Sequence, residues 1–438
     1  MTTMTDHFDD TTFPLSPEQR AVPADAPRLL LRADIKGTLD AARLRDVVAR
    51  VLGAHGALCS AIRAVPGYRG LRQQYTDGMT PLAWADTDLR DAPEAALAEW
   101  LVNLQAAPLD IARGEMVRAG LARTGDARHT LALSVHAWVG DRASLQHLFD
   151  QIATAFVDEH AFDAAEVFPY ARFVTWRQDL LDGEDAAEGR AYWQRYLAQA
   201  AALTPPRLVG RQAAASQQAV RVRADESVDA TFAGRIAACA DTLGAQPDTL
   251  LQAVWWLLIA RLDGTGRFIA GWQHDCRRDY PPMQGAVGVF DKVLPLIVET
   301  APEMRFADWF DNVDGTLAAH VEAQEYWAVE APPIAAHLAV GFACHDRPHR
   351  HGIDPQWQLA ALPGPLPAFE LALQVAWDSD GAALSVHADA ARHSEVAAQR
   401  LLMQYLCLLD AVVERPDTAL GALPLVGPRE RELLLQSQ

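Results

Sequence analysis

Strand-length apolar runs and amphipathic helical segments are mixed in both halves of this chain, and that mixture restricts the fold more than any other feature. Residues 39–52 carry apolar side chains at helical spacing behind Asp40, a residue suited to capping a helix. Residues 116–122 and 129–135 are strand-length runs joined by the turn residues 124–126, which predicts a β-hairpin. We therefore expect a mixed α+β or α/β class.

The second half repeats this style, so the 438 residues are expected to form two lobes, 1–180 and 181–438. Asp248 is predicted to cap a helix that runs to Arg261. Residues 203–217 are predicted to be a linker or an exposed loop. The other predicted elements of this half are a helix at 192–202, strands at 268–272, 294–298, 369–377 and 383–388, and a final helix at 394–413.

The formal net charge of −19 argues against several classes of partner. Phosphate backbones and anionic lipids need a basic face, so neither nucleic acid nor a membrane is expected to bind. The five cysteines are widely spaced and form no CxxC pair, so neither a disulfide framework nor a zinc ribbon is indicated. The most apolar run, 253–260, is far shorter than the ~20 residues of a membrane-spanning helix. A cytoplasmic protein is the simplest interpretation.

One segment carries a recognisable pattern of polar residues. Residues 129–144 read HTLALSVHAWVGDRAS, and a strand is predicted to end at His136 before a helix begins near Ser144. This segment resembles the HHxxxDG active-site motif of condensation domains from nonribosomal peptide synthetases. His136 and Asp141 match the first His and the Asp of that motif. The second His is replaced by Ala137, and the final Gly by Arg142.

The resemblance extends in order over most of residues 13–436. Residues 13–19 (FPLSPEQ) look like the opening segment of the family, and 55–62 (HGALCSAI) look like its HExLRTxF stretch. Residues 287–298 (VGVFDKVLPLIV) resemble the floor segment IGxFVNTLPLRV, with Asp291 and Lys292 among the altered positions. Residues 420–436 look like the exit toward an adenylation domain. The resemblance implies two chloramphenicol-acetyltransferase-like lobes in a V-shaped pseudo-dimer, with a central tunnel for carrier-protein arms.

The same resemblance implies that the condensation chemistry is lost. The second motif His is credited with positioning or deprotonating the amine nucleophile, and general-base catalysis is worth ~10²–10⁴-fold. Alanine has no lone pair, so Ala137 accepts no proton. The Arg142 guanidinium is expected to narrow the tunnel, together with Trp138, or to pair with a carboxylate such as Asp141. Trp138, Asp291 and Lys292 are the candidate tunnel or floor residues, and no catalytic residue is expected.

Structural roles are the more economical interpretation of several other polar residues. His136 is expected to be a hydrogen-bonding residue, and Asp141 an ion-pair partner for an arginine. Ser144 with His136 and Asp141 is not expected to form a hydrolase triad, because no nucleophile elbow is present. Residues 344–351 (CHDRPHRH) contain metal-competent side chains, but their spacing fits no closed metal site. That segment and 272–278 (WQHDCRR) are predicted to be polar, partner-facing loops.

Two functions remain open from the sequence. Catalytically dead condensation-like domains serve as recruitment platforms, either for cytochrome P450 enzymes or for iron/2-oxoglutarate β-hydroxylases that act on carrier-bound aspartate in siderophore synthesis. The P450-recruiting type usually has Arg after its first motif His and a doubled Asp, whereas this chain has Ala137 and the single Asp141. The β-hydroxylase type is therefore preferred. The partners would be a peptidyl carrier protein, the oxygenase and an adenylation domain, with no cofactor or metal of the domain's own. The alternative is an atypical but active domain that forms an amide or ester bond.

Overall fold

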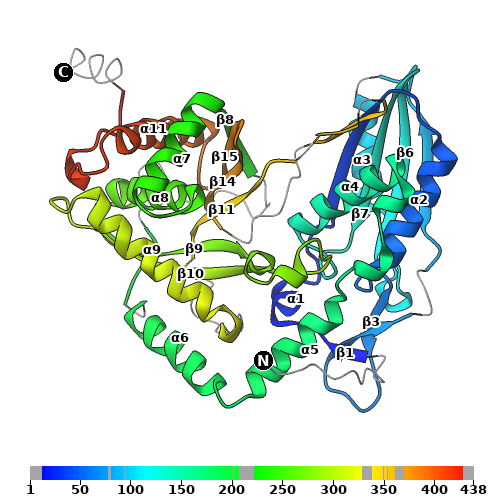
Figure 1. The fold of residues 1–438 in the computed structure, drawn as a ribbon, viewed down its shortest axis with the longest axis horizontal. Helices are drawn as coiled ribbons and strands as arrows, with labels where there is room; N and C mark the ends of the chain where they lie inside the picture. The colour runs from blue at the N-terminus through cyan, green and yellow to red at the C-terminus, as the bar shows by residue number, and fades with distance from the viewer. Residues whose placement is uncertain are drawn as a thin grey trace. The chain divides into compact units, whose positions relative to one another are not determined.

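The computed structural model describes residues 12–76, 80–93, 95–200, 202–206, 221–327, 338–348, 350–352, 354–360 and 369–427. The chain divides into two compact units, each with its own core (Figure 1). Unit 1 comprises Met1–Gly183, Asp275–Asp291 and Pro348–Pro365. Unit 2 comprises Glu184–His274, Lys292–Arg347 and Leu366–Gln438. The predicted mixture of helices and strands is confirmed in both.

Unit 1 is built on a sheet with the strand order β12-β13-β2-β7-β6-β5. Its strands are β2 (Leu29–Lys36), β5 (Ala83–Asp88), β6 (Val117–Gly125), β7 (Arg128–Val135), β12 (Arg350–His351) and β13 (Gln356–Leu359). A smaller sheet contains β1 (Thr12–Pro14), β3 (Ser60–Ala64) and β4 (Leu71–Tyr75). The helices are α1 (Pro17–Ala21), α2 (Ala41–Ala54), α3 (Ala95–Ala106), α4 (Arg142–Val157) and α5 (Tyr170–Asp182).

The alternation of side chains along β7 explains how helices cover this sheet on both faces. Leu131, Leu133 and Val135 point into the main core, which also contains apolar residues of α2 and α4. Ala132 points the other way and packs with Leu101 and Leu104 of α3. The sequence-predicted hairpin of β6 and β7 is confirmed, and Asp40 caps α2 by accepting hydrogen bonds from two backbone N–H groups.

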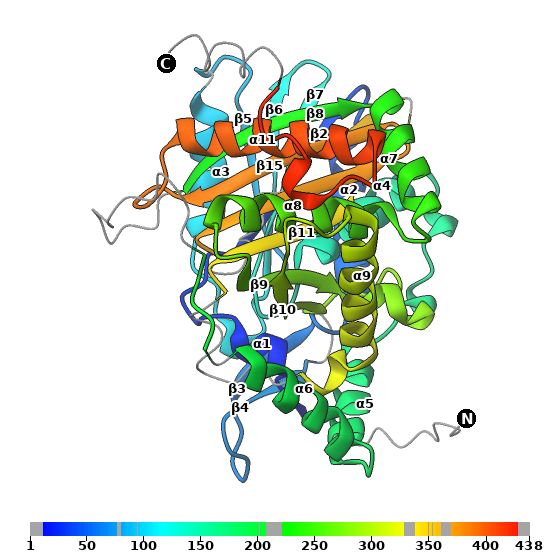
Figure 2. The ribbon, with the colours of Figure 1, turned by 90° about the vertical axis from the view of Figure 1, so that its left-hand side faces the viewer.

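Unit 2 contains a sheet with the strand order β10-β9-β11-β14-β15-β8. Its strands are β8 (Arg221–Asp229), β9 (Arg267–Asp275), β10 (Asp291–Glu299), β11 (Val340–Asp346), β14 (Leu371–Asp378) and β15 (Gly381–Asp389). The helices are α6 (Ala186–Ala200), α7 (Ala230–Thr242), α8 (Pro247–Asp263), α9 (Phe306–Glu322) and α11 (Glu395–Glu414). Figure 2 shows α11 running along β8 and β15, against which it packs.

The elements predicted for unit 2 differ from the structure mainly at their ends, and α6 begins at Ala186, six residues before the predicted start at 192. Helix α8 begins at Pro247 with Gln246 as its N-cap, so Asp248 lies in the first turn and is not the cap. A proline suits the first helical position because its missing N–H would have no partner there. The helix also continues two residues past the expected end at Arg261, to Asp263. Most of the predicted linker at 203–217 lies outside the described residues, from 207 onward.

Helix α11 is long and apolar enough, by length and composition, to cross a membrane, and it is the one such helix in the described part of the chain. Its apolar side chains include Leu402, Tyr405 and Leu409, all fully buried in the core of unit 2. Burial accounts for one face of α11, because a core helix satisfies the same criteria as a membrane span, whereas Val396 and Met403 of the same helix are exposed.

A division into contiguous lobes at residue 180 does not describe the two units. Two later segments, Asp275–Asp291 and Pro348–Pro365, belong to unit 1 although the chain on either side of each belongs to unit 2. Strand β13 pairs with the edge of β2 in antiparallel register, which explains why its segment joins unit 1. His351 of the same segment lies 2.6 Å from the Asp150 carboxylate on α4. Pairing between distant strands leaves no local signal in the sequence.

A buried histidine makes the stability of unit 2 depend on pH. His320 of α9 lies among the rings of Tyr192, Trp193 and Tyr196, with centroid distances of 5.9, 4.8 and 4.4 Å. Neither ring nitrogen hydrogen-bonds to a described residue, and burial lowers the pKa of His320 to about 4. Because the unfolded chain binds this proton near pH 6.5, folding loses stability as pH falls from about 6.5 to about 4.

We expect His320→Phe to remove roughly 2 kcal/mol of the stability lost between pH 7.5 and pH 5, since phenylalanine fills the same aromatic cage without titrating. Urea unfolding midpoints at pH 7.5 and pH 5 would be compared between the wild-type protein and the variant. His55 of unit 1 also has its pKa lowered to about 4 by burial, so the difference between the two proteins isolates His320. Equal pH slopes for both proteins would contradict this assignment.

Candidate functional site

The loop between β7 and α4 carries the altered motif residues. Its first residues are fixed by the backbone: the His136 N–H donates to the Met116 carbonyl at 2.9 Å, and the Val139 N–H donates to the His136 carbonyl at 3.0 Å. Ala137 is buried in the core of unit 1. The loop is therefore rigidly placed, and its second position offers only a methyl group.

The hydrogen bond to the His136 ring determines what this imidazole can do. Its Nδ1 accepts the Trp138 backbone N–H at 3.2 Å. Burial, followed by the charge of Arg28, lowers the pKa of His136, which favours the neutral ring. A neutral imidazole has one lone pair and one N–H, so the proton lies on Nε2 when Nδ1 accepts. His136 is thus a hydrogen-bond donor through Nε2 and has no lone pair left for a general base.

Trp138 is clamped by the N-terminal segment of unit 1. Its indole Nε1 donates to the Val22 carbonyl at 3.0 Å, and its own carbonyl accepts from Gln19 Nε2 at 2.6 Å. The indole ring also meets His136 edge-on, at a centroid distance of 5.4 Å. The predicted placement of Trp138 in space that an active domain keeps open is not tested by these contacts, but they show that the ring is immobilised.

Asp141 and Ser144 form the N-terminal cap of α4. The Asp141 carboxylate accepts the Ser144 backbone N–H at 2.8 Å, and Ser144 Oγ accepts the Asp141 backbone N–H at 3.2 Å. This reciprocal pattern satisfies two backbone donors that the helix leaves unpaired. A carboxylate at this position also interacts favourably with the helix dipole. The local sequence D-x-x-S therefore explains where α4 begins.

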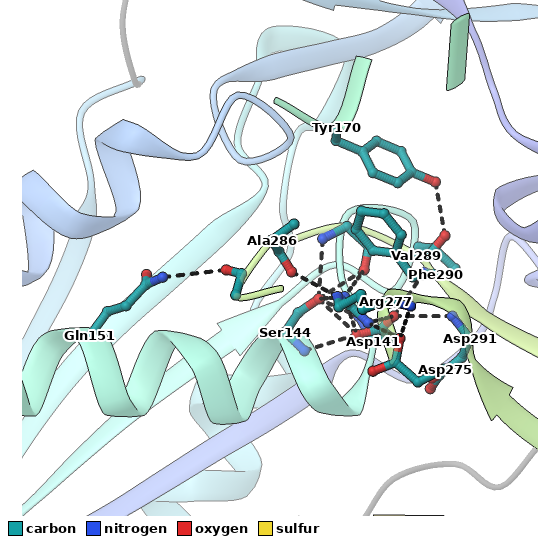
Figure 3. A network of polar contacts seen from close by, with 12 residues as sticks. Asp141, Ser144, Gln151, Tyr170, Asp275, Arg277, Ala286, Val289, Phe290 and Asp291 are labelled. Carbon is teal, nitrogen blue, oxygen red and sulfur yellow. Dashed lines mark hydrogen bonds and ion pairs between the residues drawn. The ribbon is translucent and has the colours of Figure 1, made fainter. Parts of the chain in front are cut away.

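Arg277 binds the same carboxylate with two parallel hydrogen bonds (Figure 3). Its Nη1 donates to Asp141 Oδ2 at 3.0 Å and its Nη2 donates to Oδ1 at 2.9 Å. The guanidinium also donates to the Ala286 and Gly288 carbonyls, pairs with Asp275, and lies over the Phe290 ring at 4.1 Å. The expectation that Asp141 pairs with an arginine is confirmed, and Arg277 is that arginine.

The electrostatics of this pair follow from burial and mutual attraction. Burial alone would raise the pKa of Asp141, but the Arg277 charge and hydrogen bonds from Arg277, Phe290 and Ser144 hold it below the ordinary value. Burial would likewise lower the pKa of Arg277, but the charges of Asp141 and Asp275 raise it. Both groups therefore stay ionised, and Asp141 serves as an anchor with no proton to give or take.

The start of the floor segment is fastened to this anchor. The Phe290 and Asp291 backbone N–H groups donate to Asp141 Oδ2 at 2.8 and 3.2 Å. Gly288 makes the approach possible, because a Cβ there would lie 2.1 Å from Cδ2 of Tyr170. Asp291 thus reaches the motif through its backbone, and the tunnel role predicted for its side chain remains a prediction.

Lys292 follows Asp291 but belongs to unit 2. Its Nζ lies 2.5 Å from Oε1 of Glu325, and both side chains are buried. This ion pair ties the start of β10 to the short helical turn Gln324–Tyr326. Lys292 therefore has a structural partner within unit 2, and its predicted tunnel role stays a prediction.

Arg142 is the first residue of α4 and its side chain is half-buried. The Asp141 carboxylate next to it is already bound by Arg277 in a bidentate arrangement. Narrowing of a tunnel by Arg142, and a carboxylate partner for its guanidinium, remain predictions.

The rejected hydrolase triad has no support in the geometry. Ser144 is fully buried, and its Oγ lies 2.7 Å from Asp141 Oδ1 and 2.8 Å from the Gly288 carbonyl. Arg277 Nη2 also donates to this hydroxyl at 2.9 Å. A nucleophile has to reach substrate, and this hydroxyl is enclosed by its structural partners.

The two segments predicted to be polar, partner-facing loops are not loops throughout, because Trp272–Asp275 belongs to β9 and Cys344–Asp346 to β11. For residues 272–278 the prediction was wrong at Trp272, Cys276 and Arg277, which are buried. Arg277 was missed as a site residue because a charged residue in a polar run ordinarily indicates a solvated loop. In the other segment, His345 lies 2.7 Å from Gln374 in unit 2, whereas His351 pairs with Asp150 in unit 1.

The metal-competent residues of that segment do not form a centre in the part of the chain that is described. No group of three or more His, Cys, Asp or Glu side chains is arranged there to hold a metal ion. His349 lies outside the described residues.

Trp327 is a bulky side chain of unit 2. It is buried, with its ring centroid 4.7 Å from that of Trp193.

The fold and the motif place this chain in a known family. The family model for the condensation domain matches residues 31–330, and the chain belongs to the condensation-domain family. It is similar to a linear gramicidin synthase of Brevibacillus parabrevis, with 24% identity over 79% of the chain. The match spans only 5% of that synthase, so this chain corresponds to a small part of a much longer relative.

Solved structures support the fold independently. The condensation domain of the Monacolin K polyketide synthase MokA matches with a TM-score of 0.81 and 18% identity, covering 93% of this chain and 99% of that one. The X-domain in complex with OxyB from teicoplanin biosynthesis matches with a TM-score of 0.74 and 20% identity, covering 97% and 98%. The chain therefore has the α+β fold of condensation domains, with its acetyltransferase-like lobes.

Proposed function

We propose that this chain is a condensation-family domain that no longer forms amide bonds and instead recruits a tailoring oxygenase to an amino acid held on a peptidyl carrier protein. The observation that carries this proposal is the absence of a general base among the described residues of the motif loop. Ala137 stands where the family has its second His, and the lone pair of His136 Nδ1 is engaged by the Trp138 N–H.

The pattern of retained and altered residues supports a scaffold role. Asp141 keeps its structural role, since it caps α4 and binds Arg277. The positions that differ from the family motif, Ala137 and Arg142, are those at which the family places a base or open space. The loop is therefore held in place by Asp141 and Arg277, while the group that would act on an amine is missing.

A folded domain without a general base can still act as a docking platform, which is the role proposed here. Docking an enzyme beside its carrier-bound substrate raises the local substrate concentration to ~mM, without any chemistry by the platform. The fold is shared with an X-domain that has been solved in complex with a second protein, OxyB. By analogy, this domain presents a surface to a partner enzyme and handles the carrier protein.

The motif favours a β-hydroxylase over a cytochrome P450 as the partner. The single Asp141 and the Ala137 that follows His136 differ from the pattern usual for P450-recruiting domains. The net charge of −19 favours a basic face on the partner, and a transient interface would bury ~1,000–1,500 Å². Binding of roughly micromolar affinity that weakens with salt is expected.

The test is hydroxylation of carrier-bound aspartate by an iron/2-oxoglutarate hydroxylase encoded beside the synthetase. With sub-micromolar enzyme, deleting this domain should slow hydroxylation about tenfold or more, because the tethered concentration is lost. An active condensation domain inserted in its place serves as the control for spacing and should not restore the rate. Equal rates with and without the domain would refute recruitment of a hydroxylase. A P450 that requires the domain would instead identify the other partner class.

A further inference from the structure

The hairpin of β3 and β4 extends away from the rest of unit 1 (Figure 2). Its base is anchored by buried side chains: Gln73 Nε2 donates to Ser60 Oγ at 2.6 Å, and Gln19 Nε2 of α1 donates to Gln73 Oε1 at 3.0 Å. The turn at the tip stands in open space among the described residues, since a Cβ at Gly67 or Gly70 would meet no atom within 4 Å. The hairpin is therefore a projection with a fixed base.

The tip of this hairpin holds an exposed aromatic ring in one position. The Tyr68 N–H donates to the Val65 carbonyl at 3.2 Å and closes the turn. Tyr68 is 47% exposed and Leu71 is 41% exposed. The Arg72 guanidinium lies over the Tyr68 ring at 4.2 Å, and its Nη2 donates to the Thr12 carbonyl at 3.0 Å. A ring that is already held by stacking loses less freedom on binding, which favours contact with a partner.

The charge of the hairpin is opposite to that of the whole protein. The chain has 57 acidic and 38 basic residues, yet residues 47–76 contain no Asp or Glu. The hairpin contributes Arg63, Arg69 and Arg72 to that stretch. Arg63 donates to Gln74 Oε1, whereas Arg69 is exposed and no described residue accepts a hydrogen bond from it. Tyr and Arg together are the side chains that most often dominate the binding energy of protein interfaces.

We propose that the tip of the β3–β4 hairpin anchors the partner oxygenase, with Tyr68 seated in an apolar recess whose surrounding carboxylates pair with Arg69. This inference rests on the proposed recruitment role and adds the surface that performs it. The acidic remainder of the domain attracts a basic face but does not fix its orientation. A basic projection fits only an acidic recess, so it sets the register of the complex. The tip is the anchor of a larger contact, because a stable interface covers about 800 Å² per partner.

The experiment measures the Kd of the iron/2-oxoglutarate hydroxylase encoded beside the synthetase for the full chain, by calorimetry. Tyr68→Ala removes the ring, and Arg69→Glu reverses the free charge at the tip. Arg400→Glu is the matched control, because Arg400 is likewise exposed, has no described partner, and lies on α11 of unit 2. Both arginine variants change the net charge equally, so their difference isolates the hairpin. Thermal unfolding checks that each variant is folded.

We expect Tyr68→Ala and Arg69→Glu each to weaken binding about tenfold or more, and Arg400→Glu to stay within about twofold of the wild type. Hydrogen exchange of residues 65–70 should slow in the complex. Equal binding by the wild type and both hairpin variants would overturn this anchor and leave recruitment intact. Equal losses in Arg69→Glu and Arg400→Glu would also overturn it, since only the overall charge would then matter. A wild-type chain that does not bind the hydroxylase would overturn both proposals.

Discussion

Replacing Arg277 with methionine is expected to lower the free energy of unfolding of unit 1 by roughly 3–5 kcal/mol, because it leaves the buried Asp141 carboxylate without its counter-charge. The side chains of Arg277 and Asp141 are only 2% and 6% exposed, so water does not replace the lost partner. The Ala286 and Gly288 carbonyls lose a donor in the same substitution. The loss is measured by urea unfolding, and by hydrogen exchange of the first turn of α4.

The control for this prediction is an exposed ion pair with the same N–O distance but a single hydrogen bond. Arg235 and Asp410 are also 2.9 Å apart, but their side chains are 47% and 59% exposed. Arg235→Met should cost about 1 kcal/mol or less, since surface ion pairs are screened by solvent. Adding Asp141→Asn to Arg277→Met should recover part of the loss by removing the uncompensated charge. Equal effects of Arg277→Met and Arg235→Met would show that the pair does not anchor the loop.

With donor and acceptor carrier proteins both loaded, this protein is expected to form amide product at least ~10²-fold more slowly than an active condensation domain assayed beside it. The physical reason is the missing base: Ala137 has no lone pair, and the one lone pair of neutral His136 is bound by the Trp138 N–H. Intact-protein mass spectrometry of the carrier proteins follows loading and product together.

Product formation within tenfold of the active domain would contradict this second prediction and restore the alternative of an atypical enzyme. His136→Ala would then separate two mechanisms. Loss of that activity would make His136 the reacting group despite its engaged Nδ1, whereas retention would indicate catalysis by substrate positioning alone.

The sequence was sufficient to predict elements whose signals are local. The helix behind Asp40, the hairpin of β6 and β7, and the final helix capped by Ser394 each depend on residues a few positions apart. The ion-paired role of Asp141 was also predicted, through the family motif. Its partner was not, because Arg277 is 136 residues away and lies within a polar run that is typical of a solvated loop.

The same limit explains what was missed about the motif histidine and the two units. The tautomer of His136 depends on a backbone N–H two residues later, and that geometry is visible only in the folded loop. The pairing of β13 with β2 joins segments from opposite parts of the chain, and no periodic pattern marks it. The residue type at Ala137 was enough to predict the loss of a general base. The hydrogen bonds of the folded loop were needed to establish what His136 and Asp141 do.

The late return of the chain into unit 1 has a consequence for recombining condensation domains. A gene fragment that stops at Gly183 would lack Arg277 and strand β13, since both come from later segments. Its β2 would have an open edge, which can pair with another molecule, and its Asp141 would lose the guanidinium that binds it. Exchanging the first half of this domain with that of another condensation domain would therefore pair an arginine from one parent with a carboxylate from the other. Junctions placed outside residues 12–427 keep both partners from a single parent.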